Sequence, residues 1–162
     1  FALLDEHGSD PILDKRNLLK AVVFNYLIGN CDAHAKNFSL LLDDGAVRLA
    51  PFYDLISTKV YGTLSPKFAM RIGGQQRGEW VTKEHWLKLA DEAEVGAKAV
   101  LMICEELGKT VPAAAGKLAD QFLPKHGGDE IIRQIIRHIE TMSKSMLERL
   151  KNSKGAANPK VV

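Results

Sequence analysis

The sequence is organised around the stretch Gly29-Asn30-Cys31-Asp32-Ala33-His34-Ala35-Lys36-Asn37, followed after a short interval by Ala50-Pro51-Phe52-Tyr53-Asp54. The first stretch places Asp32 five residues before Asn37, at the end of a strongly apolar pattern. The second places Asp54 just after a predicted turn between two strands. Three side chains with oxygen atoms therefore follow the ends of regular elements, where binding and catalytic residues are commonly found. This arrangement predicts a polar site.

A buried helix is predicted before this stretch, from about Ile12 to Ile28. Its apolar residues recur at the three-to-four spacing of a helical face, and the bulk at 22–24 predicts burial on more than one side. Gly29-Asn30 is a helix stop signal, and residues 5–12, upstream, are rich in turn-forming types. The polar stretch is thus expected to follow a rigid helix, which is good support for a site.

A β-hairpin is predicted between the two stretches. Two short apolar runs, 38–42 and 46–50, flank Asp43-Asp44-Gly45, and an Asp-Gly turn between such runs is typical of a hairpin. The hairpin reverses the chain, so Asp54 is expected to approach Asp32 and Asn37 although it is distant in sequence.

The remainder of the chain is predicted to be mostly helical, with a short strand over 67–72. Residues 73–78 are expected to form a flexible, substrate-facing connection. Helices are predicted from an N-cap at Thr82, over 96–107 with a stop at Gly108, from Pro112 to about 123, and over 128–151. The predicted fold class is mainly α (α+β), with a small β-hairpin at the polar site.

Composition places few further limits on function. The 162 residues suit one domain, 46% hydrophobic and 26% charged, and a net charge of +2 gives no general argument for nucleic acid or membrane binding. Cys31 and Cys104 match no metal-binding spacing, which favours free thiols in a reducing cytoplasm over a disulfide. No apolar run approaches the roughly 20 residues of a membrane span.

The residue types at the polar site suit phosphoryl transfer from a nucleotide, which needs magnesium at the phosphates and an acceptor for a hydroxyl proton. Magnesium prefers hard oxygen ligands and keeps some of its waters, so Asn37 and Asp54 can supply the protein ligands. Asp32 is then free to orient and deprotonate the attacking hydroxyl. Lys36 could place positive charge near the phosphoryl group, and His34 could contact it through its imidazole.

Each of these residues also has an ordinary structural interpretation. Aspartate and asparagine in a loop often cap the next turn, and Asp54 could be the N-cap of a helix beginning at Leu55. His34 and Lys36 could be solvated loop residues. The Asp-x4-Asn spacing alone is a weak signal, and the order of buried helix, loop, hairpin and second aspartate is what favours a site.

Residues 25–39, followed by 49–57, resemble the C-terminal part of HipA-type kinases, the toxin components of bacterial toxin–antitoxin pairs. The resemblance implies the helical C-lobe of a protein-kinase-like fold over residues 1–152. Residues 153–162 are mostly polar, small or proline, which predicts a flexible tail. It implies Asp32 as the catalytic aspartate and Asn37 and Asp54 as Mg²⁺ ligands. The ATP would be bordered by His34, Ala35, Lys36, Asn37, Tyr53 and Asp54.

The resemblance also implies a Ser/Thr protein kinase that transfers phosphate from Mg–ATP to a protein hydroxyl and arrests growth. Its implied partners are a protein substrate, a helix-turn-helix antitoxin and, through the antitoxin complex, operator DNA, with no membrane partner. The chain contains no Gly-rich phosphate loop and no strand lysine in the usual kinase setting. These are expected in an N-terminal lobe upstream of Phe1, so the isolated chain is expected to bind ATP weakly and to transfer phosphate poorly.

Two other functions are left open by the sequence. A non-catalytic, kinase-derived lobe could bind the antitoxin or DNA through a basic face, although interspersed acidic residues favour an ordinary solvated surface. The basic residues are Lys83, Lys88, Lys98, Arg133, Arg137, Lys144 and Arg149. A small-molecule kinase of the aminoglycoside type shares the Asp-x4-Asn arrangement, but the fuller motif match favours the HipA-like interpretation.

Overall fold

The computed structural model describes residues 1–127 and 129–152, so the tail predicted over 153–162 lies outside the described residues. The helices are α1 (Ala2–His7), α2 (Pro11–Ile28), α3 (Lys83–Glu92), α4 (Ala97–His126) and α5 (Asp129–Lys151), with the short 3-10 helices η1 (Ala35–Asn37) and η2 (Gly78–Trp80). The strands are β1 (Leu40–Asp43), β2 (Ala46–Leu49), β3 (Lys67–Ile72) and β4 (Gln75–Arg77). They form two antiparallel hairpins, β1–β2 and β3–β4. The predicted mainly α fold class is confirmed.

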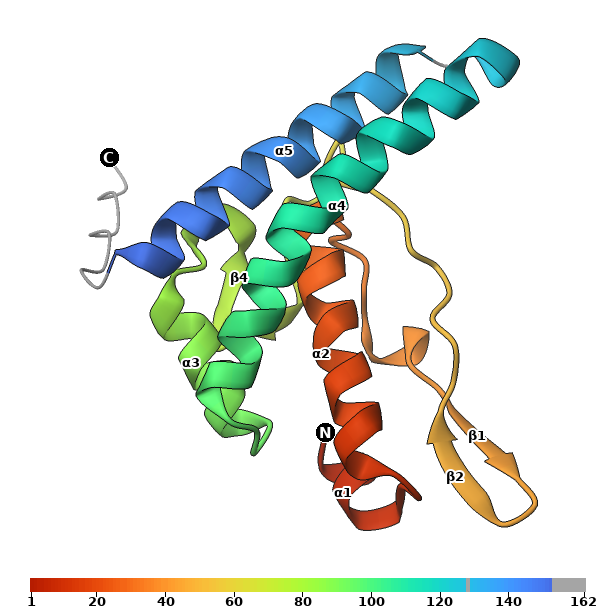
Figure 1. Cartoon of the computed structure of the whole chain (residues 1–162), viewed down its shortest axis with the longest axis vertical. Coiled ribbons are helices and arrows are strands. Elements are labelled where there is room, and N and C mark those ends of the chain that lie inside the picture. Colours follow the sequence, from red (N-terminus) through yellow and green to blue (C-terminus); the bar gives the residue numbers. More distant parts are fainter. Residues whose placement is uncertain (128, 153–162) are drawn as a thin grey trace.

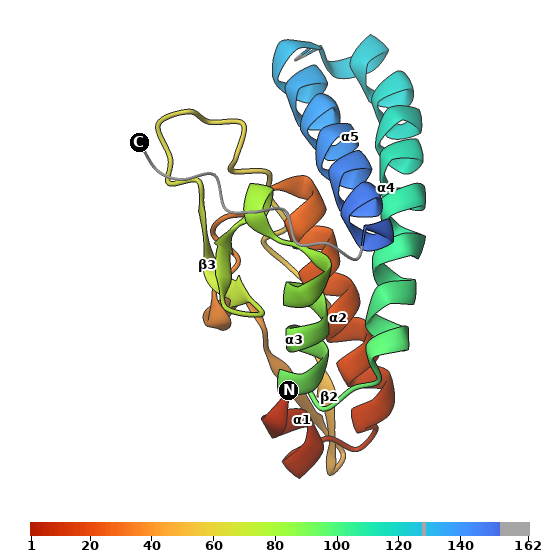
Figure 2. The same cartoon turned by 90° about the vertical axis from the view of Figure 1, so that its left-hand side faces the viewer.

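The helices surround α2, which carries the candidate site at its C-terminal end. Helices α4 and α5 pair along their length and both contact α2, while α3 packs against α4 (Figure 1). The β1–β2 hairpin projects on the other side of α2 from α3, and Figure 2 shows β3 beyond α3, away from the α4–α5 pair. The site is therefore supported by a helical core on one side and carries a small hairpin on the other.

Helix α2 begins one residue earlier than predicted, because Pro11 fits its first turn and Asp10 caps it. The Asp10 carboxylate accepts a hydrogen bond from Leu13 N at 3.2 Å. Tyr26 packs edge-on against Trp86, with ring centroids 5.3 Å apart, and against Phe68 at 6.0 Å. The predicted burial of α2 on more than one side is confirmed. Leu19, Val23, Tyr26 and Leu27 are buried along one face, and Ala21, Asn25 and Ile28 are buried on the opposite face.

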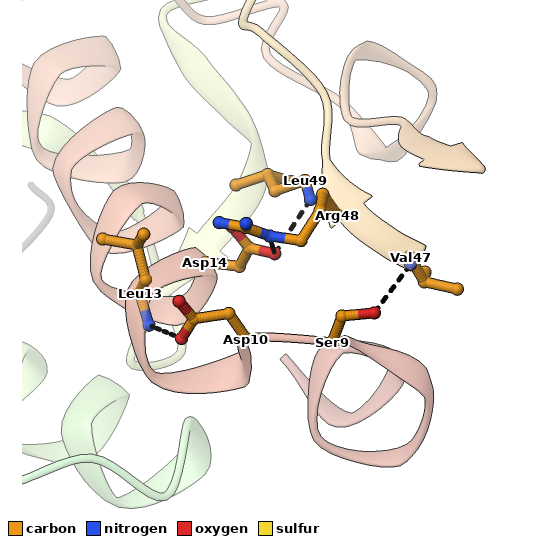
Figure 3. Close-up of polar contacts among 7 residues, drawn as sticks. All are labelled: Ser9, Asp10, Leu13, Asp14, Val47, Arg48 and Leu49. Atoms are coloured by element: carbon orange, nitrogen blue, oxygen red, sulfur yellow. Dashed lines mark hydrogen bonds and ion pairs between the residues drawn. The ribbon is translucent and has the colours of Figure 1, made fainter. Parts of the chain in front are cut away.

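The predicted β1–β2 hairpin is confirmed, and a buried carboxylate anchors it to α2 (Figure 3). Asp14, which is 2% exposed, accepts hydrogen bonds from Arg48 Nε at 3.0 Å, Arg48 Nη2 at 3.2 Å and Leu49 N at 3.0 Å. The hydrogen bond from Arg48 holds the pKa of the Asp14 carboxyl below its usual range. Ser9 adds a second attachment, because its N–H donates to Val47 O and its hydroxyl accepts from Val47 N. The sequence did not predict this anchor.

The predicted break between 96–107 and 112–123 is wrong, because α4 is continuous through Gly108 and Pro112. Proline costs a helix one hydrogen bond and strains the preceding turn. Packing compensates here: Gly108 is buried, and a Cβ atom at that position would lie only 2.9 Å from Met146 Cε and 3.1 Å from Leu147 Cδ2. Glycine therefore lets α5 approach closely, and the helix–helix interface outweighs the local signals.

Two smaller predictions are also wrong. Residues 73–78 do not form a flexible connection, because Gln75–Arg77 pairs with β3 across a turn at Gly73 and Gly74, whose φ values are +52° and +89°. The turn-rich segment predicted over 5–12 is narrower than expected, because α1 continues to His7.

Candidate active site

The loop that follows α2 is fixed by hydrogen bonds from two distant segments. Gly29 ends the helix in the left-handed conformation, and its carbonyl accepts hydrogen bonds from Thr58 N at 3.2 Å, Lys59 N at 3.0 Å and Thr58 Oγ1 at 3.1 Å. Cys31 N donates to Thr58 Oγ1 at 2.7 Å, and Cys31 O accepts from Ala69 N at 2.9 Å. The start of the loop is therefore held on both sides.

The structure brings Asn37 and Asp54 into direct contact across the base of the hairpin. Asn37 ends η1 and is 7% exposed, and its side-chain Nδ2 donates to Asp54 Oδ2 at 2.6 Å. The expected approach of these two residues, which are 17 positions apart, is thus observed. The Asn37 amide and the Asp54 carboxylate, which come from two separate segments, therefore lie side by side.

Asp54 is not a helix N-cap, so that interpretation is wrong. Residues 51–58 contain no helix, and Asp54 has a φ of +55°. Left-handed backbone is uncommon for residues other than glycine, although aspartate tolerates it better than most. Unfavourable backbone of this kind persists only where the surroundings hold it, and it is frequent at functional sites.

Asp32 lies exposed on the same loop, with its backbone N–H donating to Asn30 Oδ1 at 3.1 Å. Across residues 1–127 and 129–152, no hydrogen bond or ion pair engages the Asp32 carboxylate, which leaves both oxygens available to a bound molecule. Half-buried His34 differs from Asp32, because its Nδ1 is buried and has no hydrogen-bond partner in the described part of the chain.

Tyr53 connects the second motif to the first. Its hydroxyl donates to Lys36 O at 2.6 Å and lies 3.1 Å from Ser39 Oγ. Ala35 and Lys36 are both exposed on η1. The structure therefore gathers η1, Tyr53 and Asp54 at one place. Among the described residues, the side-chain hydrogen bonds that link Asp32 to this group run through Asn30.

Asn30 is the residue of the site that sequence reasoning missed. It is 2% exposed, and its Nδ2 donates to Asn25 Oδ1 at 3.0 Å and to Asp54 O at 3.0 Å, while its Oδ1 accepts the Asp32 N–H. The sequence contains one signal, a polar residue between an apolar helix and Asp32, but Gly29-Asn30 is also an ordinary helix stop signal. Thr58, which is also buried, carried no local signal.

The cavities lie beside the candidate site or away from it. A cavity of about 230 Å³ borders the loop at Asn30 and Ala33 and is otherwise mostly apolar. A larger one, about 520 Å³, lies between the first turns of α2 and α4, away from the loop. No group of three or more His, Cys, Asp or Glu side chains that could hold a metal ion occurs in the described ranges.

The predicted free thiols are confirmed. Cys31 and Cys104 are buried and unpaired in the part of the chain that the structure describes. Burial raises the pKa of both thiols, which keeps them protonated and unreactive.

The family model described as HipA-like C-terminal domain matches residues 1–115. The chain belongs to this family. The putative kinase Y4mE of Sinorhizobium fredii is 43% identical over 121 residues, which cover 74% of this chain and 29% of that protein. The serine/threonine-protein kinase toxin HipA of Shewanella oneidensis is 24% identical over 140 residues, which cover 86% of this chain and 32% of that protein.

A solved structure shows the same fold. The HipA chain in the complex of Shewanella oneidensis MR-1 HipA, HipB and operator DNA matches with a TM-score of 0.84 at 19% identity, covering 91% of this chain and 35% of that one. The HipA-like chain thus spans about a third of the length of these relatives. Among its described helices, none combines the length and the apolar character needed to cross a bilayer.

Proposed function

We propose that residues 1–152 are the C-terminal lobe of a HipA-like Ser/Thr protein kinase, which transfers a phosphoryl group from Mg–ATP to a protein hydroxyl. The observation that carries the proposal is the 2.6 Å contact between Asn37 Nδ2 and Asp54 Oδ2. It joins the two residue types that phosphoryl transfer needs for its metal, and Asn37 lies on the same loop as Asp32, whose carboxylate is unengaged among the described residues. The kinase names of the relatives support the same reaction class.

The donor atoms at the contact suit Mg²⁺. Because Asn37 donates through its nitrogen, its Oδ1 remains available, as does the second carboxylate oxygen of Asp54. Both are hard oxygen ligands, and Mg²⁺ commonly takes one or two protein ligands and keeps several waters. Asn37 and Asp54 would hold the ion, which would neutralise charge on the phosphate oxygens.

Other residues of the loop would act on the substrates directly. Asp32 would accept the proton of the attacking hydroxyl, for which its free carboxylate is suited. Lys36 would place positive charge near the phosphates, and half-buried His34 would contact the nucleotide through its imidazole. We assign the border of the ATP site to two short runs on either side of the hairpin: His34, Ala35, Lys36 and Asn37, and Tyr53 and Asp54.

The phosphate-binding loop and the strand lysine of a kinase would come from the remaining part of a longer protein, because the chain carries neither motif. The aligned residues cover about a third of each relative, which is consistent with such a division. The 162 residues alone are therefore expected to bind ATP weakly.

For the whole protein we propose a toxin that arrests growth in the reducing cytoplasm, where two free thiols are stable. The HipA relative was solved with HipB and operator DNA, and by analogy we propose a DNA-binding antitoxin as partner. A non-catalytic lobe that contacts DNA itself is less well supported. Several residues of the predicted basic face are engaged within the chain: Lys88 with Glu92, Arg137 with Glu130, and Arg149 with Val81 O.

The proposal is tested by substitution in the full-length protein. Asp32→Asn keeps the shape of the side chain but removes its basicity, and should lower phosphoryl transfer by about 10²- to 10⁴-fold. Asp54→Ala should remove the Mg²⁺-dependent rise in melting temperature. Asp43→Asn, which makes the same chemical change at an exposed hairpin position, serves as the control. Unchanged activity in Asp32→Asn would contradict the assignment of the base.

A further inference from the structure

The candidate site is built on a buried network that does not itself face a substrate. Three segments meet there: the end of α2 with the following loop, the residues around Asp54, and Thr58 with Lys59. Two side chains join them, Asn30 and Thr58, and both are buried. Since the site would work only if Asp32 and Asp54 keep a fixed relative position, the residues that join these segments matter to it.

Asn30 makes three hydrogen bonds in three directions. Its amide nitrogen uses both hydrogens, one to Asn25 Oδ1 at 3.0 Å and one to Asp54 O at 3.0 Å, while its oxygen accepts the Asp32 N–H at 3.1 Å. Reversing the amide would set its nitrogen against the Asp32 N–H and its oxygen against two acceptors. The orientation is therefore fixed by the network.

The hydrogen bond from Asn30 Nδ2 to Asp54 O holds the residue of the site that has an unfavourable, left-handed backbone conformation. Asp54 is left-handed, with φ of +55°, and this conformation accompanies the 2.6 Å contact of its carboxylate with Asn37. Holding the carbonyl from one side opposes rotation of this residue towards ordinary backbone angles. Such rotation would carry the Asp54 carboxylate away from Asn37.

Thr58 holds the other end of the same segment. Its hydroxyl donates to Gly29 O at 3.1 Å and accepts from Cys31 N at 2.7 Å, so the side chain bridges two positions on either side of Asn30. Thr58 therefore attaches the loop around Asn30 to the segment 54–58, and Asn30 contacts the same segment at Asp54.

We propose that Asn30 is a positioning residue that fixes the Asp32 backbone and the left-handed Asp54 relative to each other, with Thr58 anchoring the loop that carries it. This inference rests on the proposed function, since it assigns a purpose to the geometry of Asp32 and Asp54. Asn30 is 2% exposed, and it acts by keeping the proton acceptor and the metal ligand in fixed positions relative to each other.

The test uses the full-length protein and three changes that remove hydrogen bonds. Asn30→Asp keeps the shape and the acceptor for Asp32 N–H but loses both donors, Asn30→Ala loses all three bonds without adding a charge, and Thr58→Val replaces the hydroxyl by a methyl group. Each should lower kcat by about 10- to 100-fold and raise the Mg²⁺ concentration for half-maximal rate by about 10-fold, as losses of groups that orient metal ligands do. The Mg²⁺-dependent thermal shift provides a readout that does not depend on activity.

Two controls separate positioning from stability. Asn17→Asp makes the same chemical change on α2, where the Asn17 side chain has no hydrogen-bond partner among the described residues, and should leave kcat and the Mg²⁺ requirement unchanged. Thr58→Ser restores a hydroxyl and should recover both quantities. A purely structural role would lower the melting temperature and leave kcat and the Mg²⁺ requirement of the folded protein unchanged.

The outcomes distinguish this inference from the proposed function. A folded Asn30→Ala with unaltered kcat and Mg²⁺ requirement, beside an inactive Asp32→Asn, would overturn the positioning role and leave the kinase assignment intact. If Asp32→Asn and Asp54→Ala both stay active, the proposed function fails and this inference fails with it. If neither Asn30 variant folds, the comparison of Thr58→Val with Thr58→Ser decides, and equal kcat in that pair would overturn the proposal.

Discussion

Gly29 allows the strongest test of how the loop is attached to the core. It has φ of +69°, and a Cβ atom there would lie 2.7 Å from Lys59 Cβ, 3.0 Å from His138 Cδ2 and closer still to His138 Nε2. Lys59 Cβ is next to the backbone, and Lys59 N is bonded to Gly29 O, so this neighbour cannot move aside easily. Gly29→Ala therefore meets both an unfavourable backbone conformation and a steric clash.

The magnitude follows from these two contributions. A left-handed alanine costs about 1–2 kcal/mol relative to glycine, and overpacking a filled site costs about 1–3 kcal/mol. Together they predict a loss of about 2–5 kcal/mol in the free energy of unfolding, a large part of the total for a typical domain, which is about 5–15 kcal/mol. Denaturant unfolding with linear extrapolation measures this loss.

Gly45→Ala is the matched control. Gly45 has φ of +79°, and a Cβ atom there would have no neighbour within 4 Å, so only the backbone contribution of about 1–2 kcal/mol applies. The double variant Gly29→Ala/His138→Ala should recover part of the loss, because it relieves the contact with the ring but not the one with Lys59. If Gly29→Ala were no more destabilising than Gly45→Ala, the close packing of Gly29 against Lys59 and His138 would be refuted.

Two further predictions concern the hairpin anchor and the thiols. Asp14→Asn should speed hydrogen exchange across β1–β2 relative to the exposed control Asp43→Asn, because it weakens the bonds to Arg48 and Leu49. Since the pKa of Asp14 is lowered in the folded state, its contribution to stability is complete above about pH 4 and is lost as the pH falls through the folded-state value. This part of the acid destabilisation should be missing in Asp14→Asn, and an identical pH profile would contradict the anchor. Cys31 and Cys104 should resist a thiol reagent in the native protein and react in denaturant; fast labelling of the native protein would show that the site is more open than described.

The parts of the fold that the sequence predicted are those with strong local signals. Helix α2 combines a long apolar pattern with Pro11 at its start and Gly29 at its end, and the Asp-Gly turn determines the β1–β2 hairpin. The meeting of Asn37 with Asp54 followed from the hairpin, because reversing the chain leaves its two ends side by side.

The wrong predictions have a common physical origin. Gly108 and Pro112 are local break signals, but the contact of Gly108 with α5 is made by residues about forty positions later, and this contact decided the outcome. Strand β4 is only three residues long and follows two glycines, so its pairing with β3 left little trace in the local pattern.

The supporting network of the site was beyond prediction for the same reason. Asn30 reaches the Asp54 carbonyl, 24 positions away, and Thr58 reaches Gly29, 29 positions away. Both contacts depend on the irregular segment after the hairpin, whose path no periodic pattern describes. The sequence could therefore indicate the candidate catalytic and metal-binding residues, but not the buried residues Asn30 and Thr58 that support them.

Because α4 is continuous, the folded unit extends beyond the C-terminal boundary of the family match. The family match stops at residue 115, which lies within α4, between Pro112 and the end of the helix at His126. Beyond that point α5 returns along α4 and contributes Ile139, Met142, Met146 and Leu150 to the same core that holds Trp86 and Tyr26. A chain cut at residue 115 would uncover the apolar surface beneath the candidate site. The segment that the family model matches is thus shorter than the unit that shares this core, and any dissection of this lobe should follow the core.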